Sequence, residues 1–322
     1  MDIHMEKMGI EAQLKRGKRL RKRKRALFII SFLIVPIIQF LVFYVYINAN
    51  SFALAFQRKN SFLNTVEWVG WRNFEKVIEN IASNNEMGTL GYAIINSILY
   101  FILTNCIMMP MTIILAYFLW KNMPGAKIFR YTFLIPSLLP AAVLPMLYAF
   151  MLDSSVGVLT PLMYNAGLEH LVPVNGWLGT YETAQAMIIF YMLWCGCGVN
   201  IMIMTGHINR LPNDIFESIR LDGIKLFQEL WYFVIPLMLP LLNIMLVMGM
   251  SSILNFYLPP MLITKGGPNG TTKTIAYLIM DWTTQGEEGV AAAGGLMFSA
   301  IIIPFVFAVK YVLSKITPEV EY

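Results

Sequence analysis

The side chains best placed for chemistry lie in one charged segment, residues 211–240, between two long apolar runs. Pro212 suits the first turn of a predicted helix, where its missing N–H costs little. Asp214 and Glu217 lie near the positive end of that helix, which favours acidic side chains. Gly223 ends the helix, because glycine readily adopts the left-handed conformation of a cap. A loop that joins two spans needs only a few residues. A longer, charged and structured segment therefore suggests a surface that recognises another protein.

The same segment is predicted to be two-sided. Ile215, Phe216 and Ile219 recur at helical spacing and form an apolar ridge. A second helix follows Gly223 and enters the next apolar run at Ile235-Pro236. Its apolar residues are Phe227, Leu230, Trp231 and Val234. Amphipathicity alone leaves two interpretations open, a docking helix for a partner or a surface helix that packs under its own bundle.

The apolar runs contain almost no ionisable side chain. Such residues are costly inside a bilayer and usually mark ion or proton pathways, yet Asp153, Glu182 and Asp281 all fall at or beyond the ends of the runs. The chain also lacks a GxxxxGK[ST] phosphate loop, since the segment 265–268 does not fit that pattern. Neither paired carboxylates nor a Ser/His/Asp set is evident, so we expect no catalytic residue. The spacing of the cysteines, Cys106, Cys195 and Cys197, does not predict a metal site.

Composition places the chain in a membrane. It is 57% hydrophobic and 13% charged over 322 residues, whereas soluble domains carry about 25% charged residues. A helix of about 20 apolar residues crosses the hydrocarbon core, and only helices satisfy their backbone there without a closed barrel. We therefore predict an all-α membrane protein with six spans, at residues 26–48, 91–119, 131–152, 184–206, 231–257 and 291–313.

The distribution of basic residues predicts the orientation. Nine of the eleven residues from Lys15 to Arg25 are Lys or Arg, which favours a cytoplasmic anchor that binds anionic lipid over nucleic-acid binding. The loop 153–183 contains no Lys or Arg and is expected outside. Both termini are then cytoplasmic. The predicted parts are a basic segment 1–25, a first span with an outer amphipathic segment 26–90, a core 91–313 with a connecting loop 207–230, and a tail 314–322.

Two local features refine this plan. Phe74, Val77, Ile78 and Ile81 lie at helical spacing, which predicts a short outer helix that either rests on the membrane or caps the spans. The third span contains Pro136, Pro140 and Pro145. Proline removes a backbone donor and kinks a helix, so we expect this span to be bent.

The charged segment resembles the signature loop of binding-protein-dependent ABC importer permeases. That family has Glu-Ala-Ala, then Asp-Gly-Ala, then an Ile and a Pro as the next span begins. This sequence matches at Glu217, Asp222, Gly223, Ile235 and Pro236. It departs at Ser218, Ile219 and Ile224, where alanine is usual, and we interpret the larger side chains as a fit to a roomier groove on the partner.

Further segments resemble the carbohydrate branch of this family. Residues 69–74 are similar to its Gly-x-x-Asn-Phe segment, and Asn96-Ser97 begin the second span as in its members. Residues 262–269, with Gly266, Gly267 and Pro268, are similar to its Leu-Thr-x-Gly-Gly-Pro segment, which belongs to the first of two paired permeases. The segment 316–322 lacks the Gly-rich end of the other.

The resemblance implies a fold, partners and sites. The fold would be a type I importer permease with a cytoplasmic coupling helix in a bacterial plasma (inner) membrane. The partners would be a second similar permease, two cytoplasmic ABC ATPases that bind ATP and Mg, and an extracytoplasmic solute-binding protein; this chain would bind no cofactor itself. The coupling residues would be Ile215, Phe216, Glu217, Ser218, Ile219, Asp222 and Gly223. An uncharged sugar path is expected at Asn200, Asn255, Trp194 and Tyr148. The alternatives are a carrier that acts alone and, with no supporting constellation, a membrane enzyme.

Overall fold

The computed structural model describes residues 2–60, 65–82 and 90–316, with side chains from Arg21 onward. Most of the predicted tail 314–322 and the side chains of the first part of the basic segment 1–25 lie outside the described residues. The chain divides into two compact units, residues 1–54 and 55–322, which we describe separately.

The first unit is one long helical run. It consists of α1 (Asp2–Phe40), a π-helical segment η1 (Leu41–Tyr46) and most of α2 (Ile47–Ala55). The part from Arg21 to Ala55 is long and apolar enough to span a membrane. It contains the predicted span 26–48, and its apolar side chains from Leu27 to Ile47 are exposed along the helix, as a lipid-facing surface requires.

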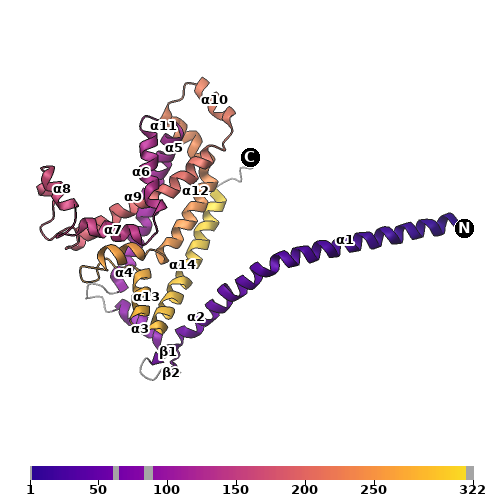
Figure 1. Ribbon diagram of the computed structural model, residues 1–322, viewed down its shortest axis with the longest axis horizontal. Coiled ribbons are helices and arrows are strands. Elements are labelled where there is room, and N and C mark those ends of the chain that lie inside the picture. Colours follow the sequence, from indigo (N-terminus) through magenta and orange to yellow (C-terminus); the bar gives the residue numbers. More distant parts are fainter. Residues whose placement is uncertain (1, 61–64, 83–89, 317–322) are drawn as a thin grey trace. The chain divides into compact units, whose positions relative to one another are not determined.

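Four further helical runs of the described chain are long and apolar enough to cross a membrane. They match four predicted spans to within about five residues at each end. Their elements are α4 (Leu90–Ile102), η2 (Leu103–Met108) and α5 (Met109–Trp120) in the first; α9 (Tyr181–Ile208) in the second; α11 (Leu226–Glu229), η4 (Leu230–Val234), α12 (Ile235–Met250) and η5 (Ser251–Leu254) in the third; and α14 (Glu288–Ile316) in the fourth (Figure 1).

The remaining predicted span, 131–152, is sharply bent. Its two helices, α6 (Ala126–Leu138) and α7 (Val143–Leu152), meet at 109°. Leu139 at the break is extended (φ −84°, ψ 147°) because it precedes Pro140, and a residue before proline avoids the helical region. The predicted bend is present, and it is a break rather than a kink.

Close helix contacts hold α6 against α9. A Cβ at Gly198 of α9 would lie 2.1 Å from the carbonyl oxygen of Phe133 in α6, so only glycine permits this approach. The main buried cluster lies where α5, α9 and α12 meet, and it includes Tyr117, Met204 and Met238. A second cluster joins α4 and α14 to α13 (Ile275–Thr284) and α3 (Arg72–Ala82).

Short elements cover the end of the bundle that is opposite α10 (Figure 1). A hairpin of β1 (Gln57–Asn60) and β2 (Thr65–Trp68), with Gln57 opposite Trp68, corrects the all-helical expectation locally. The predicted outer helix is α3, and it caps the spans, because Val77 is fully buried and the helix packs against α14. The other connections contain α8 (Leu159–Asn165), η3 (Glu169–Leu171) and η6 (Pro260–Thr264).

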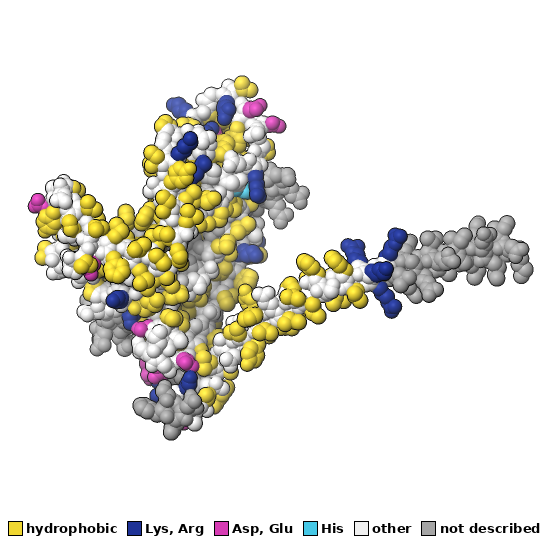
Figure 2. Space-filling model, in the orientation of Figure 1, with side chains coloured by type: hydrophobic (Ala, Val, Ile, Leu, Met, Phe, Trp, Pro, Cys, Tyr) yellow, Lys and Arg dark blue, Asp and Glu magenta, His cyan; other side chains and the backbone are white. Residues whose placement is uncertain are grey.

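Charge and apolar surface are separated on the second unit. Hydrophobic side chains cover the middle of the bundle, and many of the charged side chains lie toward its two ends (Figure 2). One of these ends carries α10 (Asn213–Leu221), the helix predicted from the charged segment.

Candidate functional site

The helix α10 ends with the glycine cap predicted for it but begins one residue later than predicted. It begins at Asn213, and Pro212 precedes the first helical residue in an extended conformation (φ −59°, ψ 128°) rather than occupying the first turn. At its other end Gly223 has φ +69°. The N–H of Gly223 donates to the Arg220 carbonyl at 3.2 Å, and that of Ile224 donates to the Ile219 carbonyl at 3.4 Å. This pair of bonds is a Schellman motif, which satisfies the last carbonyls of a helix.

One face of α10 packs on the chain's own bundle. Phe216 and Ile219 are only 4% and 2% exposed and belong to the main buried cluster. The Phe216 ring lies 4.7 Å, centroid to centroid, from that of Trp120 at the end of α5. Ile215 is half-buried against the same cluster. The apolar ridge predicted for docking on a partner therefore anchors α10 instead, since Phe216 and Ile219 have no surface left to offer.

The opposite face of α10 is open. Glu217, Ser218, Asp222 and Gly223 are exposed. Leu221 lies among them and is 89% exposed, although a leucine gains about 2 kcal/mol when buried. Sequence reasoning passed over Leu221; the available signal was an apolar residue out of phase with the ridge. Together these five residues form the exposed α10 strip.

The departures from the family pattern have a simpler cause than the one we inferred from the sequence. Ile219 is buried and Ile224 is half-buried against the main cluster. The extra volume of these two side chains fills the chain's own core. It is therefore no evidence for a roomier groove on the partner. Only Ser218 lies on the exposed strip, where its hydroxyl donates to the Ile215 carbonyl at 2.9 Å.

A buried ion pair follows α10, and sequence reasoning missed it. Glu229 of α11 is 3% exposed, and its carboxylate contacts Lys121 Nζ at 2.6 Å and 2.8 Å. Lys121 directly follows α5, 108 residues earlier in the chain. Nothing local in the sequence pairs two single charges over that distance, so only the fold reveals the contact.

Asn200 lines a cavity about midway along the long helical runs, which we call the central cavity. It is open to the surface, because Val199 and Met248 of its lining are 52% and 69% exposed. The cavity has a volume of about 290 Å³ and lies between η2, α9 and α12. Thr104 and Asn105 contribute its other polar side chains, and methionines form much of the remainder. The Asn105 amide donates to Phe101 O at 2.9 Å, and the Asn200 amide donates to Gly196 O at 3.2 Å. An amide has both donors and acceptors, so these two residues present an uncharged polar surface to the cavity.

The other predicted path residues lie elsewhere. Asn255 is exposed at the end of the third long run, and its amide donates to the Ser251 carbonyl of its own turn. Trp194 is half-buried on α9. Tyr148 is 7% exposed, its hydroxyl donates to the Met187 carbonyl at 3.2 Å, and its ring packs on Tyr191. The structure therefore does not bring Asn255, Trp194 or Tyr148 together with Asn200.

The segment of Gly266, Gly267 and Pro268 is more than a plain hairpin. Gly266 has φ +77°, and a Cβ there would lie 2.9 Å from Lys273 Cγ. The loop is fastened from within, because the Thr272 hydroxyl donates to Gly267 O at 3.0 Å. Asn96 of α4, 1% exposed, also donates to the Thr271 and Lys273 carbonyls at 2.6 Å and 2.9 Å. We call residues 264–275 the Gly-Gly-Pro loop.

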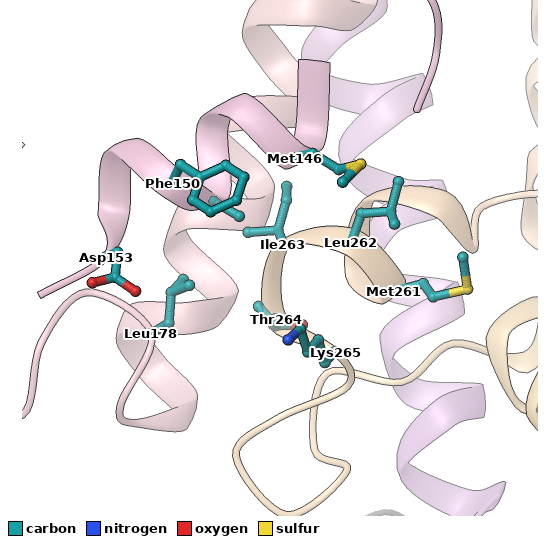
Figure 3. A pocket seen from close by; sticks show the side chains of 10 residues that line it. Met146, Phe150, Asp153, Leu178, Met261, Leu262, Ile263, Thr264 and Lys265 are labelled. Carbon is teal, nitrogen blue, oxygen red and sulfur yellow. The ribbon is translucent and has the colours of Figure 1, made fainter. Parts of the chain in front are cut away.

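A second cavity lies beside this loop. It has a volume of about 430 Å³, and its walls come from α7 and η6 (Figure 3). Met146 and Phe150 face Ile263 across it, with Asp153 and Lys265 at the ends of the two elements. Ile263 also belongs to the buried cluster that contains Tyr148, so that cluster supports one wall.

Asp153 holds a turn after α7. Its Oδ1 accepts from the Ser155 hydroxyl at 2.6 Å, from Ser155 N at 2.8 Å and from Val156 N at 3.1 Å. These bonds favour the charged form and so lower the pKa of the Asp153 carboxyl below its usual value. The bond from the Ser155 hydroxyl has the largest effect. The carboxylate is thus committed to its own turn.

Comparison with known proteins identifies the chain. Residues 108–318 match the family described as binding-protein-dependent transport system inner membrane component. The chain belongs to this family. It is therefore a multi-pass permease subunit of an ABC importer, and it is not itself an enzyme. The matched region contains α10, the Gly-Gly-Pro loop and the lining of the central cavity except Thr104 and Asn105.

Individual relatives agree with this assignment. The chain is 26% identical to the probable ABC transporter permease protein YurN of Bacillus subtilis, over 81% of this chain and 87% of that one. It is 22% identical to the multiple sugar-binding transport system permease protein MsmF of Streptococcus mutans, over 88% and 94%. It is 23% identical to the trehalose/maltose transport system permease protein MalF of Thermococcus litoralis, over 82% and 86%.

A solved structure has the same fold. A chain of a bacterial ABC transporter involved in the import of the acidic polysaccharide alginate superposes with a TM-score of 0.77 at 21% identity, over 93% of this chain and 100% of that one. The all-helical importer permease fold predicted from the sequence is thereby confirmed, with five candidate spans in the described chain, or six if the bent pair α6–α7 is one span.

Proposed function

We propose that this permease imports a carbohydrate and receives its driving force at the exposed α10 strip. The observation that carries the proposal is the division of α10 into a buried face and an open one. Phe216 and Ile219 hold the helix on the bundle, while Glu217, Ser218, Leu221 and Asp222 face outward. A helix anchored on one side and open on the other suits a docking surface that passes movement to the spans.

The partners proposed for this chain are those that the family resemblance implies. Two ATPases that bind ATP and Mg would dock on α10 and on its counterpart in a second, similar permease. A solute-binding protein would deliver the solute at the opposite end of the bundle, where the Gly-Gly-Pro loop lies. The basic residues near the N-terminus and the charge-poor loop 153–183 support cytoplasmic termini and a cytoplasmic α10.

The proposed solute site is the central cavity. Its polar side chains, Thr104, Asn105 and Asn200, are all uncharged, which suits the hydroxyl groups of a sugar and offers no counter-charge to an ion. A volume of about 290 Å³ in this chain alone leaves the rest of the site to the second permease. The relatives named for sugar transport support the same substrate class.

The experiment is purification of this chain from its native membrane in mild detergent. We expect an ATPase and a second permease to co-purify, and ATP hydrolysis by the complex to rise when binding protein loaded with a matching glycan is added. Asn200→Leu should remove that response to glycan while leaving ATPase capture intact. Recovery of the chain alone, with solute transport in vesicles that contain no ATPase, would refute the proposal.

A further inference from the structure

Four side chains at the end of α5 contact the segment that begins with α10. They are Tyr117, Phe118, Trp120 and Lys121, and we call them the α5 clamp. Trp120 packs on Phe216 of α10 at 4.7 Å between ring centroids. The other three contact α11, so one helix end contacts both α10 and α11, which together we call the elbow.

The contacts with α11 run along that whole helix. The Tyr117 hydroxyl donates to the Leu226 carbonyl at 3.3 Å. Phe118 meets Phe227 edge-on, with ring centroids 6.2 Å apart. Lys121 Nζ lies 2.6 Å from the Glu229 carboxylate.

The ion pair is the directional element of the clamp. The two side chains are only 15% and 4% exposed. Lys121 Nζ also lies 5.0 Å from the centre of the Trp120 ring and 5.6 Å from that of Tyr117, where the ring faces attract a cation. A buried charge that loses its partner is strongly unfavourable, and charge-assisted hydrogen bonds are short and directional. The pair therefore fixes one register between α5 and α11, whereas apolar contacts alone tolerate sliding.

The elbow consequently has two connections to the spans. One is the chain itself, because α11 continues through η4 into α12. The other is the α5 clamp, which joins the same elbow to a span that precedes it in sequence by about 100 residues. Both α5 and α12 line the central cavity, through Met109 and Met245.

We propose that the Lys121–Glu229 pair is a positioning device that makes α5 move together with α12 when α10 is displaced. Lys121 and Glu229 are positioning residues, because they act through the helices that they join. The inference rests on the proposed function, in which ATPases displace α10. Both walls of the central cavity then respond to one event.

The experiment follows the two walls separately in the full complex with its ATPases. Cys106, Cys195 and Cys197 are first replaced by serine, and a single cysteine is introduced as Met109→Cys on α5 or Met245→Cys on α12. The rate of reaction with a small maleimide is measured before and after trapping with ATP and vanadate. With Lys121 and Glu229 intact, trapping should change the rate at both positions.

The variants are Lys121→Glu, Glu229→Lys and the double exchange. Each single variant should reduce the response of the α5 cysteine by about tenfold or more, keep that of the α12 cysteine, and still capture the ATPases through the intact α10 strip. The double exchange should restore the α5 response, and the conservative variant Lys121→Arg, which keeps the positive charge, should retain it. Lys76→Glu is the matched control, because Lys76 and Glu287 form an exposed pair, 3.4 Å apart, at the other end of the bundle.

Three results would overturn the inference. The first is an unchanged α5 response in both single variants. The second is loss of the response at both cysteines, which would make the pair a general packing contact. The third is loss of ATPase capture, which would place the pair in docking. If an intact complex shows no response at either cysteine, or captures no ATPase, the proposed function itself fails.

Discussion

The α10 end of the bundle and the Gly-Gly-Pro loop are fastened in different ways. The loop is held by hydrogen bonds to its backbone, with Asn96 donating to two of its carbonyls and Ser97 accepting from Ile275 N at 2.9 Å. The helix α10 is held by side chains, chiefly Phe216 and Ile219. An irregular loop away from water must have its backbone groups satisfied, whereas a helix satisfies its own.

This difference separates what can move from what cannot. Displacing the Gly-Gly-Pro loop would break several buried hydrogen bonds at once, each costly to leave unmade. Displacing α10 leaves its internal hydrogen bonds intact and alters the packing of side chains such as Phe216 and Ile219. In the proposed function α10 moves with the ATPases and the Gly-Gly-Pro loop stays ordered, and the two kinds of attachment suit those two roles.

The largest expected effect is at the α10 anchor. Phe216→Ala should destabilise the elbow by about 3–5 kcal/mol, because it removes a buried ring and leaves a cavity beside Trp120. Thermal unfolding in detergent would show this as a lower midpoint. The neighbouring Glu217→Ala is the matched control: its effect on stability should stay within about 0.5 kcal/mol, while ATPase capture falls. Equal stability losses in the two variants would contradict the division of α10 into two faces.

A smaller effect is expected at the loop. Asn96→Ala leaves the Thr271 and Lys273 carbonyls without their donor, at about 1–3 kcal/mol for a buried group left unpaired. Limited proteolysis within 264–275 should accelerate while α10 stays equally protected. Asn255→Ala is the control, since the Asn255 amide is exposed and bonds only within its own turn. If Asn96→Ala leaves the cleavage rate unchanged, the loop is held by something else.

The cap of α10 tests conformation alone. A Cβ at Gly223 would meet no heavy atom within 4 Å, so only its φ of +69° penalises a side chain. Gly223→Val should cost about 1–2 kcal/mol and reduce uptake while membrane insertion stays normal. Gly223→Asn should retain uptake, because asparagine tolerates this conformation. Normal uptake by the Gly223→Val variant would show that the cap conformation at Gly223 is not needed for coupling.

The smallest effect concerns pH. Because hydrogen bonds lower the folded-state pKa of Asp153, its turn contributes stability above the usual carboxyl pKa. This contribution disappears only as the pH falls through the lowered value. In a titration followed by NMR, the pKa of the Asp153 carboxyl should therefore lie below the usual value for aspartate. Ser155→Ala should raise the pKa of Asp153 toward that usual value. A pKa that Ser155→Ala leaves unaltered would assign the shift to the backbone donors.

Much of the fold could be predicted from the sequence because membrane spans are set by length and hydropathy. The cap at Gly223 and the ridge of Phe216 and Ile219 were also predictable, since glycine and helical spacing act locally. The direction of that ridge was not, because an apolar face fits its own bundle and a partner equally well. In the structure the ridge faces its own bundle, because the Phe216 ring packs against Trp120.

Other features depend on distant parts of the chain. The Lys121–Glu229 pair and the contact of Asn96 with the Gly-Gly-Pro loop join residues more than 100 positions apart. The uncharged polar residues that line the central cavity come from separate helices. From the sequence Asn200 could be proposed as a site residue, but nothing in the sequence indicates that Thr104 and Asn105 lie beside it. The short strand at 57–60 is entirely polar, and the alternation of polar and apolar residues at 65–68 covers only four residues, a weak signal for a strand.

The contact between Trp120 of the α5 clamp and Phe216 of α10 also bears on whether the number of membrane crossings between them is odd or even. Trp120 and Phe216 are in contact, so the chain leaves α5 and leaves α9 on the same side of the bilayer. Between those two points it must cross an even number of times. If α9, which is long and apolar enough to span a membrane, is one crossing, the bent pair α6–α7 must supply the other. A bend of 109° therefore does not turn the chain back, and α7 ends on the side where η6 meets it.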